Sequence, residues 1–167
     1  PVPVMKVIRS EESPGASAHI ALGLNSLGMD VRFHCCVGDD PEGTCISEML
    51  SNEGISTEQI VIVRSMKTLT KIRFYGSRES LLEKSQILLQ ADRGPLDPLS
   101  SKISEALTTS ALKSLKDSCA LVISDYDKGV IDESGSHLLI REAHNIGIPI
   151  IVDPKLTGLE KSRNATV

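Results

Sequence analysis

Two short apolar runs in the last third of the chain each end in aspartate and lysine. Residues 121–129 read Leu-Val-Ile-Ser-Asp-Tyr-Asp-Lys-Gly, and residues 150–155 read Ile-Ile-Val-Asp-Pro-Lys. Runs of this kind are typical of strands buried on both faces, and ligands of parallel α/β sheets lie just beyond the carboxyl ends of such strands. Carboxylate and ammonium groups at one sheet edge suit a polyhydroxy, phosphorylated ligand. The residues that we expect to share this crevice are Asp125, Lys128, Asp153 and Lys155.

Each of these residues also has a plainer structural interpretation. Asp125 can accept hydrogen bonds from sugar hydroxyls or assist a cation, and Lys128 can hold a phosphate as a point charge. The same pair would suit a capped helix start with solvated charges. Pro154 fixes the turn that follows Asp153 and so aims Lys155 at a phosphate with little loss of entropy, unless this is merely an exposed turn. Position at the strand ends favours a functional role for both segments.

A segment of small residues, 14–18 (Pro-Gly-Ala-Ser-Ala), opens a predicted helix. Free N–H groups and the helix dipole favour an anion or a hydroxyl-rich ligand there, although small residues also permit close helix packing. His19, one turn further along, can donate to a ligand or simply be packed. Lys71 and Arg73 lie two residues apart on one face of a predicted strand, which suits either a phosphate or a solvated surface.

The acidic pair Asp39 and Asp40 follows Gly38 at the end of another predicted strand. Because aspartate stabilises the N-terminus of a helix, we interpret this pair as a helix start. We find no serine, cysteine or histidine triad and no Walker loop, so no general base is identified.

Composition narrows the class of protein. The 167 residues suffice for one domain with a real core, and the net charge is −4 with a pI near 5.6. This charge predicts no binding to nucleic acid or to an anionic membrane surface. No apolar run approaches the roughly 20 residues that cross a bilayer, and we expect no signal peptide. The four cysteines lack zinc-site spacing, so we expect no metal site and free thiols in a reducing cytoplasm.

The periodicity of apolar residues predicts an α/β fold. The βα alternation at both ends of the chain fits right-handed parallel units, and the middle of the chain fits a small separate sheet. Expected strands are 2–8, 31–37, 60–63, 68–75, 87–90, 120–124 and 148–152. Expected helices are 15–27, 41–52, 99–116 and 133–145, with Gly28, Gly54 and Gly147 as stops.

With these segments in order, the chain resembles the ribokinase-like (PfkB) carbohydrate kinases, and among them the bacterial kinases of D-glycero-beta-D-manno-heptose 7-phosphate. The resemblance spans nearly the whole chain and rests on the order of several short motifs. They are 1–4 (Pro-Val-Pro-Val), 15–21 (Gly-Ala-Ser-Ala-His-Ile-Ala), 26–28, 37–40, 68–73, 124–129 and 152–155. It implies a doubly wound, mostly parallel sheet that carries a small β lid, incomplete in this chain. Residues 1–167 would be the central part of one kinase domain, with lid strands at 2–8, 68–75 and 87–90.

The resemblance also implies an activity. Such kinases transfer the γ-phosphoryl group of ATP, with Mg²⁺, to a sugar hydroxyl, chiefly by positioning and charge stabilisation. Their lid covers the sugar and often forms a homodimer contact. By this resemblance Gly15, Ala16, His19, Lys71, Arg73, Asp125 and Lys128 would bind substrate, and Asp153 and Lys155 would approach the phosphate or nucleotide. The aspartate base lies in a Gly-Ala-Gly-Asp loop that we expect beyond Val167, so we expect a fragment that is inactive alone.

Departures from the family pattern leave two alternatives open. Ala16 stands where the first loop usually has a second glycine, His19 stands at its asparagine, and Gln90 stands where arginine is common. One alternative is a degenerate, non-catalytic homologue that binds a sugar phosphate or a protein partner. The other is a PfkB kinase for fructose phosphate or a nucleoside.

Overall fold

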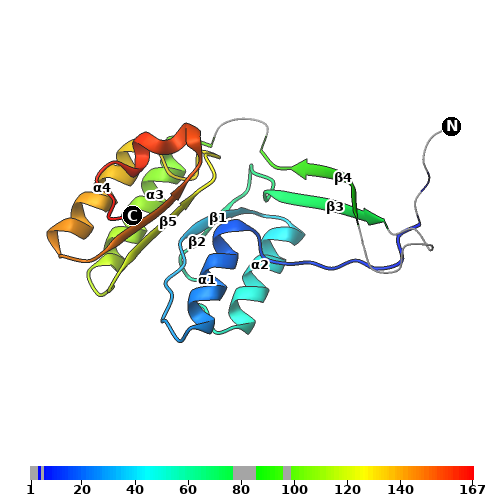
Figure 1. Cartoon of the computed structure of the whole chain (residues 1–167), viewed down its shortest axis with the longest axis horizontal. Helices are drawn as coiled ribbons and strands as arrows, with labels where there is room; N and C mark the ends of the chain where they lie inside the picture. Colours follow the sequence, from blue (N-terminus) through cyan, green and yellow to red (C-terminus); the bar gives the residue numbers. More distant parts are fainter. Residues whose placement is uncertain (1–3, 5, 77–85, 96–98) are drawn as a thin grey trace.

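The computed structural model describes residue 4 and residues 6–76, 86–95 and 99–167. Its elements form three two-stranded sheets with helices packed on two of them, a mixed α/β arrangement (Figure 1). The helices are α1 (Ala16–Ser26), α2 (Pro41–Asn52), α3 (Ser101–Leu115), α4 (Glu133–Asn145) and the 3₁₀ helix η1 (Leu156–Ser162). The strands are β1 (Cys35–Gly38), β2 (Ile60–Val63), β3 (Thr70–Gly76), β4 (Gln86–Arg93), β5 (Leu121–Asp125) and β6 (Ile150–Pro154).

The N-terminal unit is built on the parallel pair β1 and β2, with α1 and α2 packed beside it (Figure 1). The apolar faces of the two helices meet in one core because their buried residues recur at helical spacing. This core consists of Ala18, Ala21, Phe33, Leu50 and Ile55. Its small alanines allow α1 to lie close to its neighbours.

The C-terminal unit repeats this plan with the parallel pair β5 and β6, α3 and α4. Its core consists of Leu115, Ile123, Ile140, Ala143 and Ile150. The end of the chain runs beside β6, where the N–H of Val167 donates to the carbonyl of Ile150 at 3.1 Å. The two apolar runs that the sequence singled out are therefore neighbouring parallel strands of one unit.

The hairpin of β3 and β4 is antiparallel and extends away from the helices (Figure 1). Every residue of β4 is exposed, and the pairing shifts register between Phe74 and Tyr75. The small separate sheet expected in the middle of the chain is thus present.

The helix boundaries follow the predicted caps. Asp40 precedes α2 and accepts a hydrogen bond from the N–H of Gly43 at 3.0 Å, and Pro41 takes the first helical position. Gly28 and Gly54 have φ values of 85° and 80° just beyond α1 and α2. This left-handed conformation suits glycine, so both residues end their helices as expected.

Two predicted strands need correction. The expected strand 2–8 is not found in its described part, because Val4 and residues 6–8 belong to no strand. Val4, Val7 and Ile8 are 94%, 68% and 91% exposed, so no described partner strand buries them. The expected strand 31–37 begins only at Cys35, preceded by an isolated bridge between Arg32 and Ser56. Residues 2, 3 and 5 and most of the connection 76–85 lie outside the described residues.

Candidate functional site

The carboxyl ends of β5 and β6 lie side by side, as the sequence indicated. Ser124 pairs with Asp153 and Asp125 with Pro154 in a parallel register. The N–H of Lys155 donates to the backbone carbonyl of Asp125 at 3.1 Å. The loop after β5 and the turn after β6 therefore start from one sheet edge, which is where parallel α/β sheets hold their ligands.

The carboxylate of Asp125 is occupied by contacts within the chain. Its side chain is 3% exposed. Oδ1 accepts a hydrogen bond from the N–H of Asp127 at 2.8 Å, and Oδ2 accepts one from Nζ of Lys161 at 2.9 Å. In this structure Asp125 holds the loop that follows β5 and the helix η1 together, and its oxygens do not point at open solvent.

Lys161 is the residue at this edge that the sequence analysis missed. Its ammonium group also contacts Oδ1 of Asp127 at 2.9 Å and the carbonyl of Ile131 at 3.2 Å. Burial lowers the pKa of Lys161, but hydrogen bonds and charge from Asp125 and Asp127 outweigh this and raise the pKa above its usual value. The available signal was Asp125 itself, because a carboxylate that is expected to be buried needs either a cation or several hydrogen-bond donors as partners.

Three of the predicted residues at this edge are open to a ligand. Lys128, Asp153 and Lys155 are all exposed. Nζ of Lys155 lies 4.7 Å from the centroid of the Tyr126 ring, a cation–π contact that restricts its long side chain. One carboxylate and two cations thus remain available where the strand ends meet.

The other predicted residues lie on separate elements. Gly15 precedes α1 without a side-chain cap, Ala16 begins the helix with φ 35°, and His19 is exposed in its first turn. Lys71 and Arg73 are exposed on β3, two residues apart and therefore on the same face. Nε of Arg73 donates to the side chain of Gln90 at 3.1 Å. Among the described residues, no hydrogen bond or ion pair joins these groups to the ends of β5 and β6.

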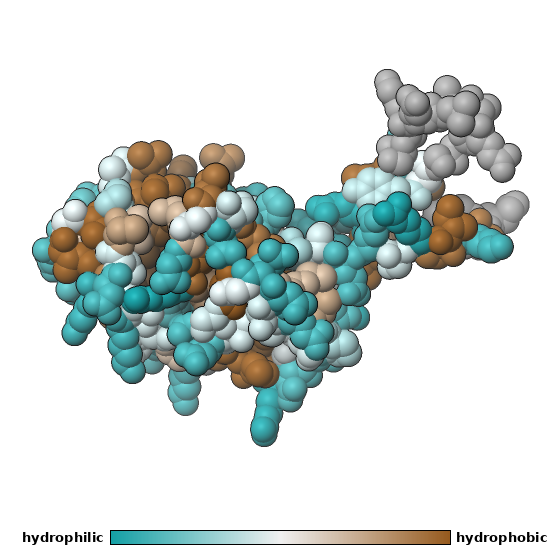
Figure 2. All heavy atoms as spheres, turned by 90° about the horizontal axis from the view of Figure 1, so that it is seen from below, coloured by the Kyte–Doolittle hydropathy of each residue, from teal (hydrophilic) through white to brown (hydrophobic). Residues whose placement is uncertain are grey.

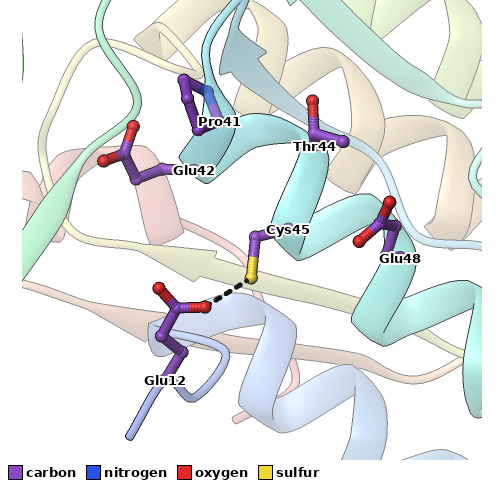
Figure 3. Close-up of a pocket in the computed structure, with 6 residues that line it drawn as sticks. All are labelled: Glu12, Pro41, Glu42, Thr44, Cys45 and Glu48. Atoms are coloured by element: carbon purple, nitrogen blue, oxygen red, sulfur yellow. Dashed lines mark hydrogen bonds between the residues drawn. The ribbon is translucent and has the colours of Figure 1, made fainter. Parts of the chain in front are cut away.

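A hollow lies elsewhere, at the start of α2. It has a volume of about 390 Å³, and Figure 3 shows the side chain of Cys45 directed toward Glu12 within it. Sγ of Cys45 donates to Oε2 of Glu12 at 3.1 Å; this bond, with burial and nearby carboxylates, raises the pKa of the thiol. Glu42 and Glu48 complete an acidic lining that repels a phosphate. None of the residues predicted to bind substrate lines this hollow.

The described residues do not fit a resident magnesium ion. Within the described ranges there is no group of three or more His, Cys, Asp or Glu side chains that could hold a metal. Both carboxylates of the acidic pair nearest the sheet edge, Asp125 and Asp127, already contact the ammonium group of Lys161.

Of the helices in the described part of the chain, none is long and apolar enough to cross a membrane.

Comparison with known proteins places the chain in a family. Residues 4–163 match the pfkB family carbohydrate kinase. The bifunctional protein HldE of Salmonella dublin is 33% identical over 173 residues, and that of Actinobacillus succinogenes is 33% identical over 167 residues. Each alignment covers all of this chain and 32% or 33% of the relative, so the chain spans about a third of their length.

Solved structures show the same fold over part of their length. The fructokinase of Xylella fastidiosa superposes with a TM-score of 0.58 at 18% identity, over 95% of this chain and 47% of the fructokinase. A putative ribokinase II from E. coli superposes with a TM-score of 0.60 at 18% identity, over 90% of this chain and 48% of that protein. The fructokinase has also been solved with bound ATP. With the family match across residues 4–163, these findings show that the chain belongs to the pfkB family of carbohydrate kinases.

Proposed function

We propose that this chain supplies part of the sugar-phosphate site of an ATP-dependent kinase whose substrate is a heptose 7-phosphate or a close analogue. The observation that supports the proposal is the parallel alignment of β5 and β6. Asp153 and Lys155 lie at the carboxyl end of β6, and the loop that follows β5 contains Lys128. The 33% identity to HldE proteins favours a heptose over other sugars. ATP, accompanied by Mg²⁺, would be the second substrate, and the reaction would take place in the cytoplasm.

The exposed residues at this sheet edge would bind different parts of the ligand. Lys128 and Lys155 act as point charges that hold phosphate oxygens, and Asp153 accepts hydrogen bonds from sugar hydroxyls. The occupied carboxylate of Asp125 holds the loop that carries Lys128, so it acts on the ligand through that loop. The N-terminus of α1, with Gly15, Ala16 and His19, and the pair Lys71 and Arg73 on β3 would approach the ligand from other sides.

The hairpin would serve as the lid and as a homodimer contact. Five of its large apolar side chains are 40% to 59% exposed, and Figure 2 shows hydrophobic spheres on the arm that projects from the body of the molecule. An isolated two-stranded sheet of this kind is marginal in water unless something covers a face. The exposed residues are Ile72, Tyr75, Ile87, Leu88 and Leu89.

Binding of a sugar phosphate tests this site on the 167-residue chain directly. Isothermal titration with a heptose 7-phosphate should show binding that weakens tenfold or more in Lys155→Ala, or about 1.4 kcal/mol. Lys102→Ala, on the exposed first turn of α3, is the matched control and should bind as the parent does. Equal affinity in the parent and Lys155→Ala would remove Lys155 from the site.

A kinase assay separates catalysis from binding. We expect the chain alone to show no ATP-dependent phosphorylation of a heptose phosphate, because no segment of this sequence matches the Gly-Ala-Gly-Asp loop that carries the aspartate base of the family. In a longer protein that contains this chain and an intact catalytic loop, Lys155→Ala should lower turnover tenfold or more. Measurable turnover by the 167-residue chain would contradict the first expectation.

A non-catalytic binding protein is the second candidate. The specific observation in its favour is the engagement of both Asp125 oxygens within the chain, together with His19 and Ala16 at the α1 start. This candidate predicts sugar-phosphate binding without turnover, even in the longer protein. A substrate panel of heptose, fructose phosphate and nucleoside would distinguish both candidates from other sugar kinases.

A further inference from the structure

The first turn of α2 contacts both ends of the β3–β4 hairpin. Thr68 lies two residues before β3, and Arg93 is the last residue of β4, where it pairs with Thr70. Asp40, the residue that caps α2, binds Thr68, and Glu42 in the first turn forms an ion pair with Arg93. One short segment of the core therefore contacts the hairpin where each of its strands joins the body.

The Asp40 carboxylate makes more contacts than a helix cap requires. Oδ1 accepts from the N–H of Gly43 at 3.0 Å and from the hydroxyl of Thr68 at 2.6 Å. Oδ2 accepts from the N–H of Thr68 at 2.9 Å. The Thr68 hydroxyl in turn accepts from the N–H of Gly38 at 2.8 Å. Asp40 and Thr68 are 9% and 7% exposed, so this network lies out of solvent.

The backbone at this junction is packed too closely to admit other side chains. A Cβ on Gly38 would lie 2.4 Å from the carbonyl oxygen of Met66 and 2.9 Å from the nitrogen of Thr68. A Cβ on Gly43 would lie 2.3 Å from the carbonyl oxygen of Gly38. The two glycines thus let residues 66–68 lie directly against the turn between β1 and α2.

Beyond this junction, few contacts among the residues that the structure describes hold the hairpin against the body. Within the described residues, β3 and β4 pack extensively only on each other. The Glu42–Arg93 pair is partly exposed on both sides, so it contributes little rigidity. The buried Asp40–Thr68 network is the more strongly held of the two anchors.

We propose that Asp40 is a positioning residue that sets the orientation of the β3–β4 hairpin relative to α2, in addition to capping the helix. This inference does not depend on the proposed kinase function, because it concerns the geometry of the 167-residue chain. Loss of the Thr68 contacts should leave α2 and both strands folded while the hairpin samples many orientations.

Asparagine at position 40 separates the two roles. In Asp40→Asn the side-chain oxygen still accepts from Gly43, and asparagine is a good helix cap. Its amide nitrogen, however, faces the N–H of Thr68, and two donors cannot bond. The matched control is Asp132→Asn, because Asp132 caps α4 through the same contact to a glycine three residues on, Gly135, at 2.7 Å.

The readout is the distance between two bio-orthogonal spin labels, one at Ile87 on the hairpin and one at Ser51 in α2, both of which are exposed. The parent and Asp132→Asn should give one narrow distance distribution by pulsed electron resonance. Asp40→Asn should broaden it at least twofold, with an unchanged far-UV circular dichroism spectrum. A narrow, unshifted distribution in Asp40→Asn would overturn the proposal.

A second pair of variants, at position 68, tests the same network in case substitution of Asp40 prevents folding. Thr68→Val removes the hydroxyl that joins Gly38 and Asp40, whereas Thr68→Ser keeps it. Thr68→Val should broaden the distribution and Thr68→Ser should restore it to the parent width. Equal widths in the valine and serine variants would show that the network does not set the orientation.

Discussion

Two buried aspartates lie at or just after the carboxyl ends of two parallel strands, and the molecule satisfies their carboxylates in opposite ways. Asp40 follows β1, and its oxygens accept only from neutral groups, namely two backbone N–H groups and the Thr68 hydroxyl. Asp125 ends β5, and one of its oxygens faces the ammonium of Lys161. Neutral donors bind a carboxylate without introducing a second buried charge, whereas a lysine must itself be desolvated.

This difference matters for what each strand end can do. The contacts of Asp40 join β1, α2 and the start of β3, so that carboxylate is structural throughout. The contacts of Asp125 instead hold a loop whose neighbours Lys128 and Lys155 stay exposed. The same residue type at the end of the same kind of strand therefore joins a helix start to the base of the hairpin in one unit and supports a loop beside a candidate ligand site in the other.

Removal of Lys161 should produce the largest loss of stability. Lys161→Met leaves the buried Asp125 carboxylate without its counter-ion, which we expect to lower the free energy of unfolding by about 3 kcal/mol. Urea denaturation followed by circular dichroism measures this. Lys102→Met, an exposed control, should change it by less than about 0.5 kcal/mol. A Lys161→Met variant as stable as the control would mean that Asp125 finds another partner or does not need one.

Asp40→Ala should rank second. The substitution removes a helix cap and also leaves the buried N–H and hydroxyl of Thr68 without an acceptor, a combined cost of about 2 kcal/mol. Asp132→Ala removes a cap from α4 and a bond from the exposed Ser134 hydroxyl, but it leaves no N–H outside the helix start without an acceptor, so about 1 kcal/mol is expected. The two variants compared by urea denaturation isolate the contribution of Thr68. Equal losses would indicate that Asp40 is only a cap.

Local sequence patterns were sufficient to predict the helix start at Asp40. The Gly38–Asp–Asp40–Pro41 segment predicted a helix start because its signals all lie within a few residues, and α2 begins there. The bounds of α4, Glu133–Asn145, were likewise predicted from periodicity and the glycine that follows. Caps and helix faces depend on near neighbours, which a sequence displays directly.

Long-range partners were not predictable in the same way. The sequence placed Asp125 at the proper sheet edge, but Lys161 lies 36 residues further along and belongs to no motif. Thr68 reaches Asp40 across 28 residues for a similar reason. The strand expected at 2–8 failed because alternation of apolar residues predicts a strand only where a partner exists to pair with it. Each of these features depends on where distant segments meet.

Thiol reactivity should follow the packing of the two units. Burial raises the pKa of Cys35 to about 12 and that of Cys36 to about 11, whereas Cys119 is exposed. A thiol reagent at pH 8 should therefore modify Cys119 at least tenfold faster than the β1 pair, since the thiolate is the reactive form. Mass spectrometry of the labelled peptides gives the order. Labelling of Cys35 ahead of Cys119 would show that β1 opens readily.

The smallest expected effect is on the pH dependence of stability. This dependence should distinguish Asp40 from the ion pair between Asp125 and Lys161. Burial opposes ionisation of Asp40, but hydrogen bonds from Thr68 and Gly43 lower its pKa below 3.8, so its contribution is present above that pH and is lost as the pH falls further. The pKa of Lys161 is raised above 10.5, so its contribution is present below that pH and is lost as the pH rises through the raised value.

At alkaline pH the buried thiols of Cys35 and Cys36 also affect the free energy of unfolding. Above about pH 9 these thiols ionise only in the unfolded state, which lowers the stability of the folded protein. Because the parent and Lys161→Met contain the same cysteines, the thiol contribution cancels in the difference between their free energies of unfolding. This difference should be constant from neutral pH to about pH 10 and shrink above it, while the difference between the parent and Asp40→Ala should shrink only in acid. Because protonation of the unpaired Asp125 also shrinks the Lys161→Met difference in acid, the alkaline end of the range is the one that discriminates. A Lys161→Met difference that stayed constant as the pH rose past 10.5, or an Asp40→Ala difference that shrank there, would contradict the contrast between the neutral partners of Asp40 and the charged partner of Asp125.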